Sequence, residues 1–156
     1  MMRLVVFSDS HGDTISLKMA IKNEPDADVF IFLGDGIYDW ESCEPLLKNK
    51  ISVAVRGNCD SSFLPYEKRL TAKFADTTVY CTHGDAEQVK FSLEALKMKA
   101  GFSEATLALF GHTHTPYKEY DNGLYLFNPG SVRQNSYGIV DITDNGIMCF
   151  HKKIVM

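Results

Sequence analysis

The first third of the chain alternates short apolar runs with amphipathic stretches. The apolar runs at residues 4–7, 29–33 and 51–55 have the length of strands, and an unbroken apolar run is typical of a strand that is buried on both faces. The stretches between them, from about 14–23 and 40–47, have the pattern of helices that cover a sheet. This β-α-β-α-β order predicts right-handed crossovers and a parallel sheet.

The rest of the chain is richer in hairpins. Two tight-turn signals, Asp121-Asn122-Gly123 and Asp144-Asn145-Gly146, each separate two apolar runs, and Ala75-Asp76 separates another pair. A helix is expected over about 86–100 and is expected to end at Gly101, because glycine commonly terminates helices. The expected strands of this part are 70–74, 78–82, 107–110, 117–120, 124–128, 137–142 and 147–155.

Parallel units followed by antiparallel hairpins predict two mixed sheets packed face to face with helices outside. The fold class is therefore α/β, a four-layer α/β/β/α sandwich of two mixed sheets flanked by helices. At 156 residues the chain has the size of one domain, so residues 1–156 are expected to form a single domain.

Composition and charge narrow the choice of partners. The net charge is −4, and no basic stripe is present that would follow a nucleic-acid backbone. An anionic substrate would therefore need a local positive charge, which bound metal ions could supply. The opening apolar run at 4–7 is too short for a signal-peptide core or a membrane span, so a cytoplasmic protein without a membrane partner is expected.

The four cysteines are Cys43, Cys59, Cys81 and Cys149. They are far apart and contain no C-x-x-C pair, which argues against a zinc knuckle and against a disulfide framework. Three of them are expected to be small buried hydrophobic residues.

Potential metal ligands follow five of the expected strands. Loops beyond the carboxyl ends of strands are where α/β proteins form sites, so these side chains could converge on one crevice. Asp9-x-His11 and His112-x-His114 each place two ligands two residues apart, where the side chains of an extended chain share a side. The seven residues are Asp9, His11, Asp35, Asn58, His83, His112 and His114.

Each of these residues also has an ordinary structural interpretation. An Asp or Asn after a strand often forms a turn or caps a helix, and an isolated His such as His83 is often a hydrogen-bonded residue of the core or surface. The joint pattern favours a metal site, because four of the five histidines occur after strands together with the acidic and amide residues. His151 is the exception, since it lies inside the last apolar run, and it is interpreted as structural.

Five segments of the chain resemble, in order and spacing, the five motifs of the calcineurin-like metallophosphoesterases. The short length, the cysteine of the third segment and the later Asn128-Pro129-Gly130-Ser131 are similar to the YfcE-type phosphodiesterase branch, which also resembles a subunit of retromer. The five segments are Asp9-Ser10-His11, Gly34-Asp35-Gly36, Gly57-Asn58-Cys59-Asp60, Thr82-His83-Gly84 and Gly111-His112-Thr113-His114.

The resemblance implies two divalent transition-metal ions per chain. One ion would be held by Asp9, His11, Asp35 and His114, and the other by Asp35, Asn58, His83 and His112, so that Asp35 bridges the two. A hydroxide between the ions would attack the phosphorus of a small phosphate ester in line. Asp35, Asn58, His83 and His112 are the residues assigned to catalysis. Oxygen and imidazole ligands suit manganese, nickel, iron or zinc, and the amide of Asn58 favours manganese.

Two positions depart from the family pattern. Many relatives have a histidine where this chain has Cys59, and that histidine is thought to help protonate the leaving oxygen. A thiol is a weaker candidate for this role, so the resemblance does not assign the leaving-group acid. Asp85 stands where relatives often have another histidine. Arg133 has two interpretations, a contact to the phosphate and an ordinary solvated arginine, and Asn128-Pro129-Gly130-Ser131 is either a simple turn or part of the site.

Three functions compete. The first is a binuclear metal-dependent phosphoesterase, either a phosphodiesterase or a phosphatase, of which the phosphodiesterase is preferred. The second is a protein-interaction scaffold that keeps the fold without catalysis, as the resemblance to the retromer subunit would allow. The third is a structural metal domain, which the absence of thiolate ligands disfavours. The intact ligand set favours the enzyme, and a homo-oligomer is left open.

Overall fold

The computed structural model describes residues 1–156. Its helices are α1 (Thr14–Lys22), α2 (Ile37–Ser42) and α3 (Glu94–Phe102), with short 3₁₀ helices η1 (Glu44–Leu46) and η2 (Val132–Gln134). Its strands are β1 (Met2–Phe7), β2 (Val29–Phe32), β3 (Ile51–Ala54), β4 (Arg69–Phe74), β5 (Thr77–Thr82), β6 (Leu107–Leu109), β7 (Tyr117–Asp121), β8 (Leu124–Asn128), β9 (Ser136–Thr143) and β10 (Gly146–Lys153).

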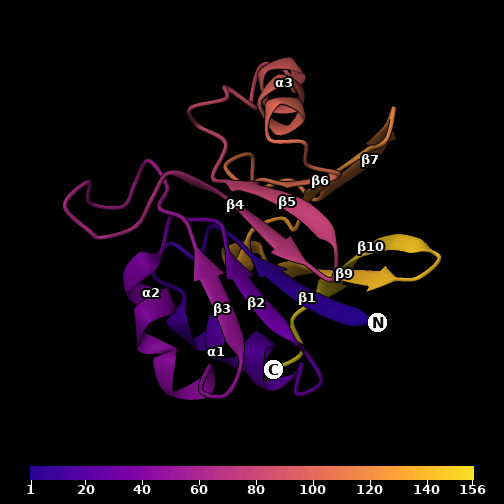
Figure 1. Ribbon diagram of the computed structural model, residues 1–156. Helices are drawn as coiled ribbons and strands as arrows, with labels where there is room; N and C mark the ends of the chain where they lie inside the picture. Colours follow the sequence, from indigo (N-terminus) through magenta and orange to yellow (C-terminus); the bar gives the residue numbers. More distant parts are fainter.

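Two five-stranded sheets lie face to face, one in the order β10-β9-β1-β2-β3 and the other in the order β4-β5-β6-β8-β7. In Figure 1, α1 and α2 cover the outer face of the first sheet and α3 lies outside the second. Both sheets are mixed: β1, β2 and β3 pair in parallel, as do β5, β6 and β8, and the hairpin partners pair antiparallel. The predicted four-layer α/β/β/α sandwich is confirmed.

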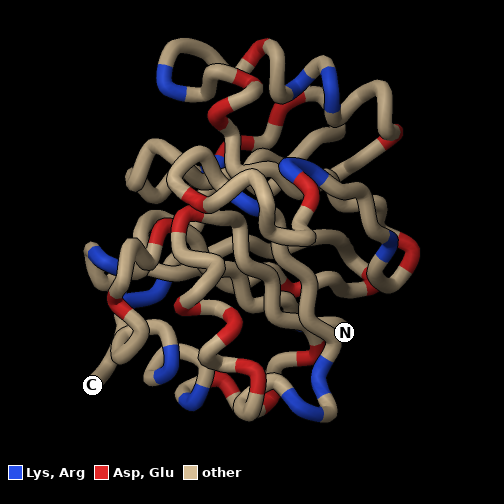
Figure 2. Tube along the Cα trace, turned by 90° about the vertical axis from the view of Figure 1, so that its left-hand side faces the viewer, with Lys and Arg blue, Asp and Glu red and all other residues tan.

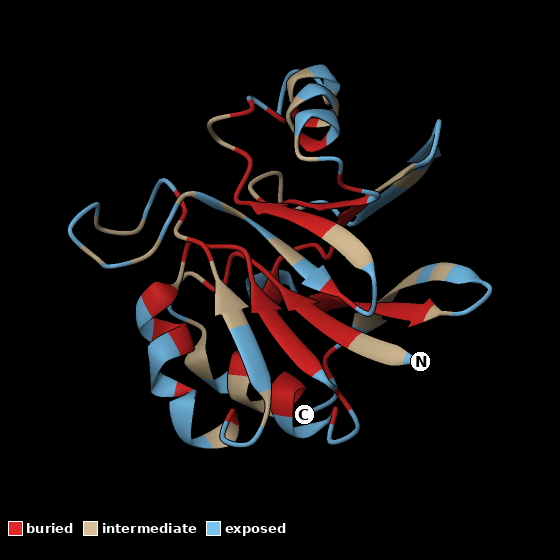
Figure 3. Ribbon diagram, in the orientation of Figure 1, coloured by how far each residue is buried: buried red, intermediate tan, exposed pale blue.

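Three apolar layers hold the four structural layers together. On β1, Leu4 and Val6 face the second sheet, whereas Val5 and Phe7 face α1 and α2. This alternation explains why the strand is apolar at every position. Figure 3 shows the central strands buried almost throughout, whereas the loop between β3 and β4 is mainly exposed. None of the helices has the length and apolar character needed to cross a bilayer.

Two predicted helices differ from the observed ones. The helix expected over 40–47 is α2, which begins at Ile37 and ends at Ser42, and η1 follows it. Pro45 lies within η1 and cannot donate a backbone hydrogen bond, which explains the break. The helix expected over 86–100 begins only at Glu94, after a series of turns. It also runs through Gly101 to Phe102, so the prediction that Gly101 terminates it is wrong.

The cysteine prediction is partly wrong. All four cysteines are free, as expected, but only Cys43 and Cys81 are buried. Cys149 is partly buried and Cys59 is exposed.

Candidate metal centre

Six of the seven residues predicted as ligands lie together in two clusters. Asp9, His11 and His114 form one cluster, and Asp35, His83 and His112 form the other; within each, the potential ligand atoms all lie within 4.8 Å of one another. The clusters are adjacent, because His11 Nε2 lies 3.4 Å from Asp9 Oδ1 and 3.7 Å from Asp35 Oδ2. The potential ligands in the loops after strands of both sheets therefore lie together, as their positions in the sequence predict.

Asp9 carries an unsatisfied oxygen at the middle of this arrangement. Its side chain is fully buried, and Oδ2 accepts hydrogen bonds from the Ser8 hydroxyl and from the His112 backbone N–H. Oδ1 accepts no hydrogen bond. Three imidazole Nε2 atoms lie around it, those of His114 at 3.1 Å, His11 at 3.4 Å and His83 at 3.8 Å. A buried carboxylate oxygen without a partner is costly, and a cation at this point would satisfy it.

The imidazoles are oriented in a way that suits ligands. His83 Nδ1 lies 2.7 Å from the carbonyl oxygen of Leu33, which can only accept, so Nδ1 carries the proton and Nε2 offers a lone pair. That Nε2 faces Asp35 Oδ2 at 3.1 Å and His112 Nδ1 at 3.3 Å. His11 Nε2 and His114 Nε2 face each other at 3.2 Å. Basic atoms that converge on a common point form a donor set that fits a divalent cation.

The pKa shifts agree with a centre that attracts cations. Burial raises the pKa of Asp35, but the hydrogen bond and charge of His83, the Cys59 N–H and the charge of His11 outweigh it and lower the pKa to about 2. Burial lowers the pKa of His83, yet Asp35, Asp9 and the Leu33 carbonyl raise it overall. The pKa of His112 is lowered by burial and by the positive charges of His83 and Lys90, which favours the neutral ring.

Asn58, the seventh predicted ligand, is not joined to the clusters by a hydrogen bond. Its side chain is exposed, and its amide nitrogen lies 3.6 Å from Cys59 Sγ. The neighbouring Cys59 does reach the centre, because its N–H donates to Asp35 Oδ1 at 2.8 Å. The Cys59 thiol also groups with His11 and Asp35 as a potential ligand set. Burial, together with the charges of Asp35, Asp60 and Asp9, raises the pKa of this thiol.

The ligand pairs are not held in extended chain, so that part of the sequence argument is wrong. Asp9, His11, His112 and His114 all have positive φ, between 43° and 71°, which is the left-handed region. The members of the second pair consequently go to different clusters, His112 to Asp35 and His114 to Asp9. Non-glycine residues in this region are uncommon and gather at functional sites.

Glycine is required next to two of the ligands. A Cβ on Gly57 would collide with the Asp35 carboxylate and backbone, and a Cβ on Gly111 would collide with Ser8 and with the Asp9 carboxylate. The loops therefore pack directly against the two acids, as glycines beside the ligands suggest.

Two further carboxylates position the ligand loops. Asp60 accepts hydrogen bonds from four backbone N–H groups, those of Asp35, Gly36, Ile37 and Gly57, at 2.7–3.0 Å.

Asp39 accepts hydrogen bonds from the Ser10 and Thr14 hydroxyls and from the Gly12 N–H, and so fixes the loop that carries His11. Neither role could be predicted from the sequence. The only signal was their position, Asp60 at the end of the third motif and Asp39 four residues after Asp35.

The segment Asn128–Ser131 belongs to the framework of the centre. The Asn128 side chain donates to the Gly111 carbonyl at 3.1 Å and to Thr113 Oγ1 at 3.0 Å. Ser131 Oγ donates to the Asp9 carbonyl at 2.8 Å. Behind this segment, His151 Nε2 contacts the Asn128 carbonyl oxygen at 2.7 Å and its ring stacks on Phe127, which agrees with its structural interpretation.

Of the two other positions noted in the sequence, Arg133 lies at the surface and Asp85 is partly buried. Arg133 is exposed, and its backbone N–H, rather than its guanidinium, points to the Asp9 carbonyl at 3.4 Å. Asp85 forms an ion pair with Lys68 at 3.5 Å.

Known proteins share the sequence pattern and the fold of this chain. A model of the calcineurin-like phosphoesterase superfamily domain matches residues 2–145. The phosphodiesterase YfcE of Escherichia coli is 28% identical, in an alignment that covers 90% of this chain and 88% of that protein. A predicted phosphoesterase from Streptococcus pneumoniae has the same fold, with a TM-score of 0.78, 24% identity and coverage of 97% and 98%. Vps29 from Entamoeba histolytica complexed with zinc also shares it, with a TM-score of 0.74, 16% identity and coverage of 99% and 100%.

Proposed function

The chain belongs to the calcineurin-like phosphoesterase superfamily, and from this premise we propose that it is a metal-dependent phosphodiesterase that hydrolyses a small phosphate ester. The observation that carries the proposal is the buried Asp9 Oδ1, which lacks a hydrogen bond and is surrounded by three imidazole nitrogens. A site with this donor set and this missing partner suits a bound cation better than a structural hydrogen-bond network. The phosphodiesterase among the relatives supports the choice of ester.

We propose two divalent ions, with manganese as the first candidate. Asp9, His11, Asp35 and His114 would hold one, and Asp35, Asn58, His83 and His112 would hold the other. The ions, when bound, supply positive charge for the phosphate and lower the pKa of water so that it can act as the nucleophile near neutral pH. The exposed Asn58 side chain would have to turn toward the second position to contribute its amide oxygen.

The chain's own residues hold the charges that this chemistry needs. Asp35, with its pKa near 2, stays anionic at neutral pH and lies between the two clusters. The bond from His83 to the Leu33 carbonyl fixes the tautomer that leaves Nε2 free. Elsewhere, lysines and arginines are interspersed with acids along the trace rather than gathered on one face (Figure 2). Attraction for a phosphate therefore has to come from the centre itself.

The proposal is tested by removing and restoring metal. Chelator-treated protein is expected to lose hydrolysis of bis-p-nitrophenyl phosphate and to regain it when Mn²⁺ is added, because the proposed nucleophile is a water that the metal ions would activate. Elemental analysis of the untreated protein is expected to give close to two transition-metal ions per chain. Full activity after complete removal of metal would refute the proposal, and inactivity with Mn²⁺, Ni²⁺ and Zn²⁺ alike would favour a scaffold.

The leaving-group acid is tested at Cys59. A thiol whose pKa is raised by burial and by nearby carboxylates stays protonated but donates its proton poorly, so rates are expected to fall steeply as the leaving-group pKa rises. Cys59→His is expected to flatten this dependence and to improve alkyl diesters more than nitrophenyl diesters. Rates for a series of aryl and alkyl diesters in both proteins provide the measurement. An unchanged slope would show that position 59 does not supply the proton.

A non-catalytic scaffold is the second candidate function, and the shared fold of Vps29 is the observation that favours it. The two proposals differ in what they require of the clusters. A scaffold needs the fold, whereas catalysis needs the ligands, and six of the seven predicted ligands converge in this chain. This convergence is why the enzyme is preferred.

A further inference from the structure

A groove with a volume of about 310 Å³ opens between the loop at residues 89–93 and the segment from Phe110 to Tyr117. Its apolar wall consists of Val89, Phe91, Leu93, Phe110 and Tyr117. The rings of Phe110 and Tyr117 meet edge to face with their centroids 6.4 Å apart, so one side of the groove is aromatic. Phe91, on the opposite side, is 87% exposed.

The groove adjoins the metal centre. Thr113, which lies between His112 and His114 in the chain, forms part of its lining. The Gly111 N–H, next to the lining residue Phe110 in the chain, donates to the His83 carbonyl at 2.8 Å and ties the two ligand loops together. Lys90 also lines the groove and is exposed. A molecule bound at the centre would therefore have this groove as its neighbour.

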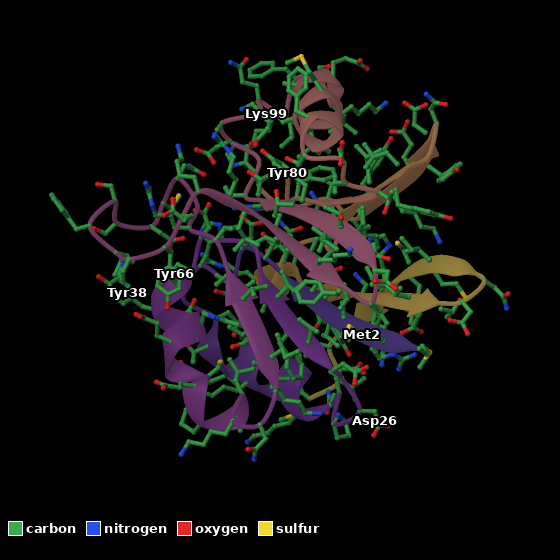
Figure 4. All side chains as sticks on the ribbon, in the orientation of Figure 1. Met2, Asp26, Tyr38, Tyr66, Tyr80 and Lys99 are labelled. Atoms are coloured by element: carbon green, nitrogen blue, oxygen red, sulfur yellow. The ribbon has the colours of Figure 1, made fainter.

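The wall formed by residues 89–93 is anchored rather than loose. Glu87 is buried and accepts hydrogen bonds from the Tyr80 hydroxyl at 2.7 Å and from Thr82 Oγ1 at 2.9 Å. Figure 4 shows Tyr80 of β5 on the side of the second sheet that faces α3 and Lys99 on α3 itself, and the Lys99 ammonium lies 4.0 Å from Glu87. Gln88 has a φ of 53°, so the chain turns there and lays Val89 against Gly84 instead of continuing into a helix. The late start of α3 thus creates the groove.

We propose that this groove binds an apolar, aromatic ester group of the substrate while the phosphate lies at the metal centre. The inference rests on the proposed function and adds the class of substrate. The inference is based on the different chemistry of two adjacent regions. The metal centre is ionic and suits the phosphate, whereas the groove beside it is aromatic and has a single charged side chain, that of Lys90. An ester with one anionic and one aromatic part complements both regions.

The test uses two diesters with the same leaving group, p-nitrophenyl phenyl phosphate and p-nitrophenyl methyl phosphate. The native protein is expected to prefer the phenyl ester by about tenfold or more in kcat/KM, because the ring is removed from water in the groove. Phe91→Ala and Tyr117→Ala are each expected to reduce this preference about threefold or more. Comparing ratios between proteins cancels the intrinsic difference in reactivity of the two esters.

Matched controls replace residues of the same type outside the groove, one on α3 and one on β7. Phe102→Ala replaces an exposed phenylalanine at the end of α3, and Tyr120→Ala replaces an exposed tyrosine of β7 that packs on Tyr125. Both are expected to keep the native preference. Calorimetric titration of the metal-loaded protein with phenyl phosphate and methyl phosphate gives a readout that does not depend on turnover, with the same expected preference and the same loss in Phe91→Ala.

The outcomes separate this inference from the proposed function. Hydrolysis of both diesters with an identical ratio in all five proteins would overturn the groove and leave the phosphodiesterase standing. If neither diester were hydrolysed but the protein bound phenyl phosphate more tightly than methyl phosphate in a way that depends on Phe91, the proposed enzymatic function would be wrong and the groove would be supported as a binding site. If Phe91→Ala changed the mass in sedimentation and left the ratio unchanged, the groove would instead be an interface between copies of the chain, and the inference would be wrong.

Discussion

His112→Ala is expected to hydrolyse bis-p-nitrophenyl phosphate at least about a thousandfold more slowly than the native protein, measured as kcat/KM with saturating Mn²⁺. His112 Nδ1 faces His83 Nε2 at 3.3 Å, so the substitution removes one of the converging donors. The fold should persist, because the side chain lies at the mouth of the sheets and is only partly buried. Circular dichroism and urea unfolding would verify this.

His151→Ala is the matched control. His151 packs on Phe127 and contacts the Asn128 carbonyl, so its loss is expected to cost about 1–2 kcal/mol of stability. The kcat/KM of His151→Ala is expected to stay within about threefold of the native value, because Asn128 keeps its own hydrogen bonds to Gly111 and Thr113. If His151→Ala lost activity while His112→Ala retained it, the site would be assigned to the wrong histidines.

The architecture could be predicted because the length of an apolar run and the residues of a tight turn determine the structure of their own segment. The runs at 4–7 and 29–33 are apolar at every position because α1 and α2 bury one face and the second sheet buries the other. The two Asp-Asn-Gly signals turn the chain at the β7–β8 and β9–β10 hairpins, where Gly123 and Gly146 have positive φ. These features need no knowledge of distant contacts.

The start of α3 could not be predicted in the same way. Residues 86–93 have a composition compatible with a helix, but the Glu87 carboxylate is held inside the protein by Tyr80 and Thr82. That interaction joins the segment to β5, and the backbone there forms turns, with the Val89 N–H donating to the Gly84 carbonyl, instead of a helix. A tertiary contact of this kind leaves no periodic signal in the sequence.

The residues of the candidate site could be predicted from the sequence, but the backbone conformation that places them could not. Residues that follow strands converge because strand ends converge, which is a property of topology. The left-handed conformation of Asp9 and His112 depends on tight packing of several loops, including the close approach allowed by Gly57 and Gly111. The four backbone bonds to Asp60 likewise arise only after the second and third motifs come together. Such contacts between loops are not encoded in the spacing of any one segment.

Asp9→Asn is expected to abolish the stabilisation of the protein by metal. Mn²⁺ at a thousandfold excess over its dissociation constant should raise the free energy of unfolding of the native protein by about 4 kcal/mol. In Asp9→Asn the gain should fall below about 1 kcal/mol, because the buried Oδ1 that lacks a partner is the oxygen that a cation would satisfy. Urea unfolding at pH 8, with Mn²⁺ or with chelator, measures both values without reference to turnover.

The same substitution is also expected to cost little stability when no metal is bound. In chelator, the free energy of unfolding of Asp9→Asn is expected to lie within about 1 kcal/mol of the native value or above it, because Oδ1 makes no hydrogen bond that could be lost and the substitution removes a buried carboxylate. The asparagine oxygen can still accept from Ser8 and from the His112 N–H, and asparagine tolerates the φ of 57° at this position. Asp76→Asn, at an exposed turn with a φ of 67°, is the control and should leave both values unchanged. A loss of more than about 3 kcal/mol in the metal-free variant would mean that Asp9 is a structural residue, and equal stabilisation of both proteins by Mn²⁺ would mean that it is not a ligand.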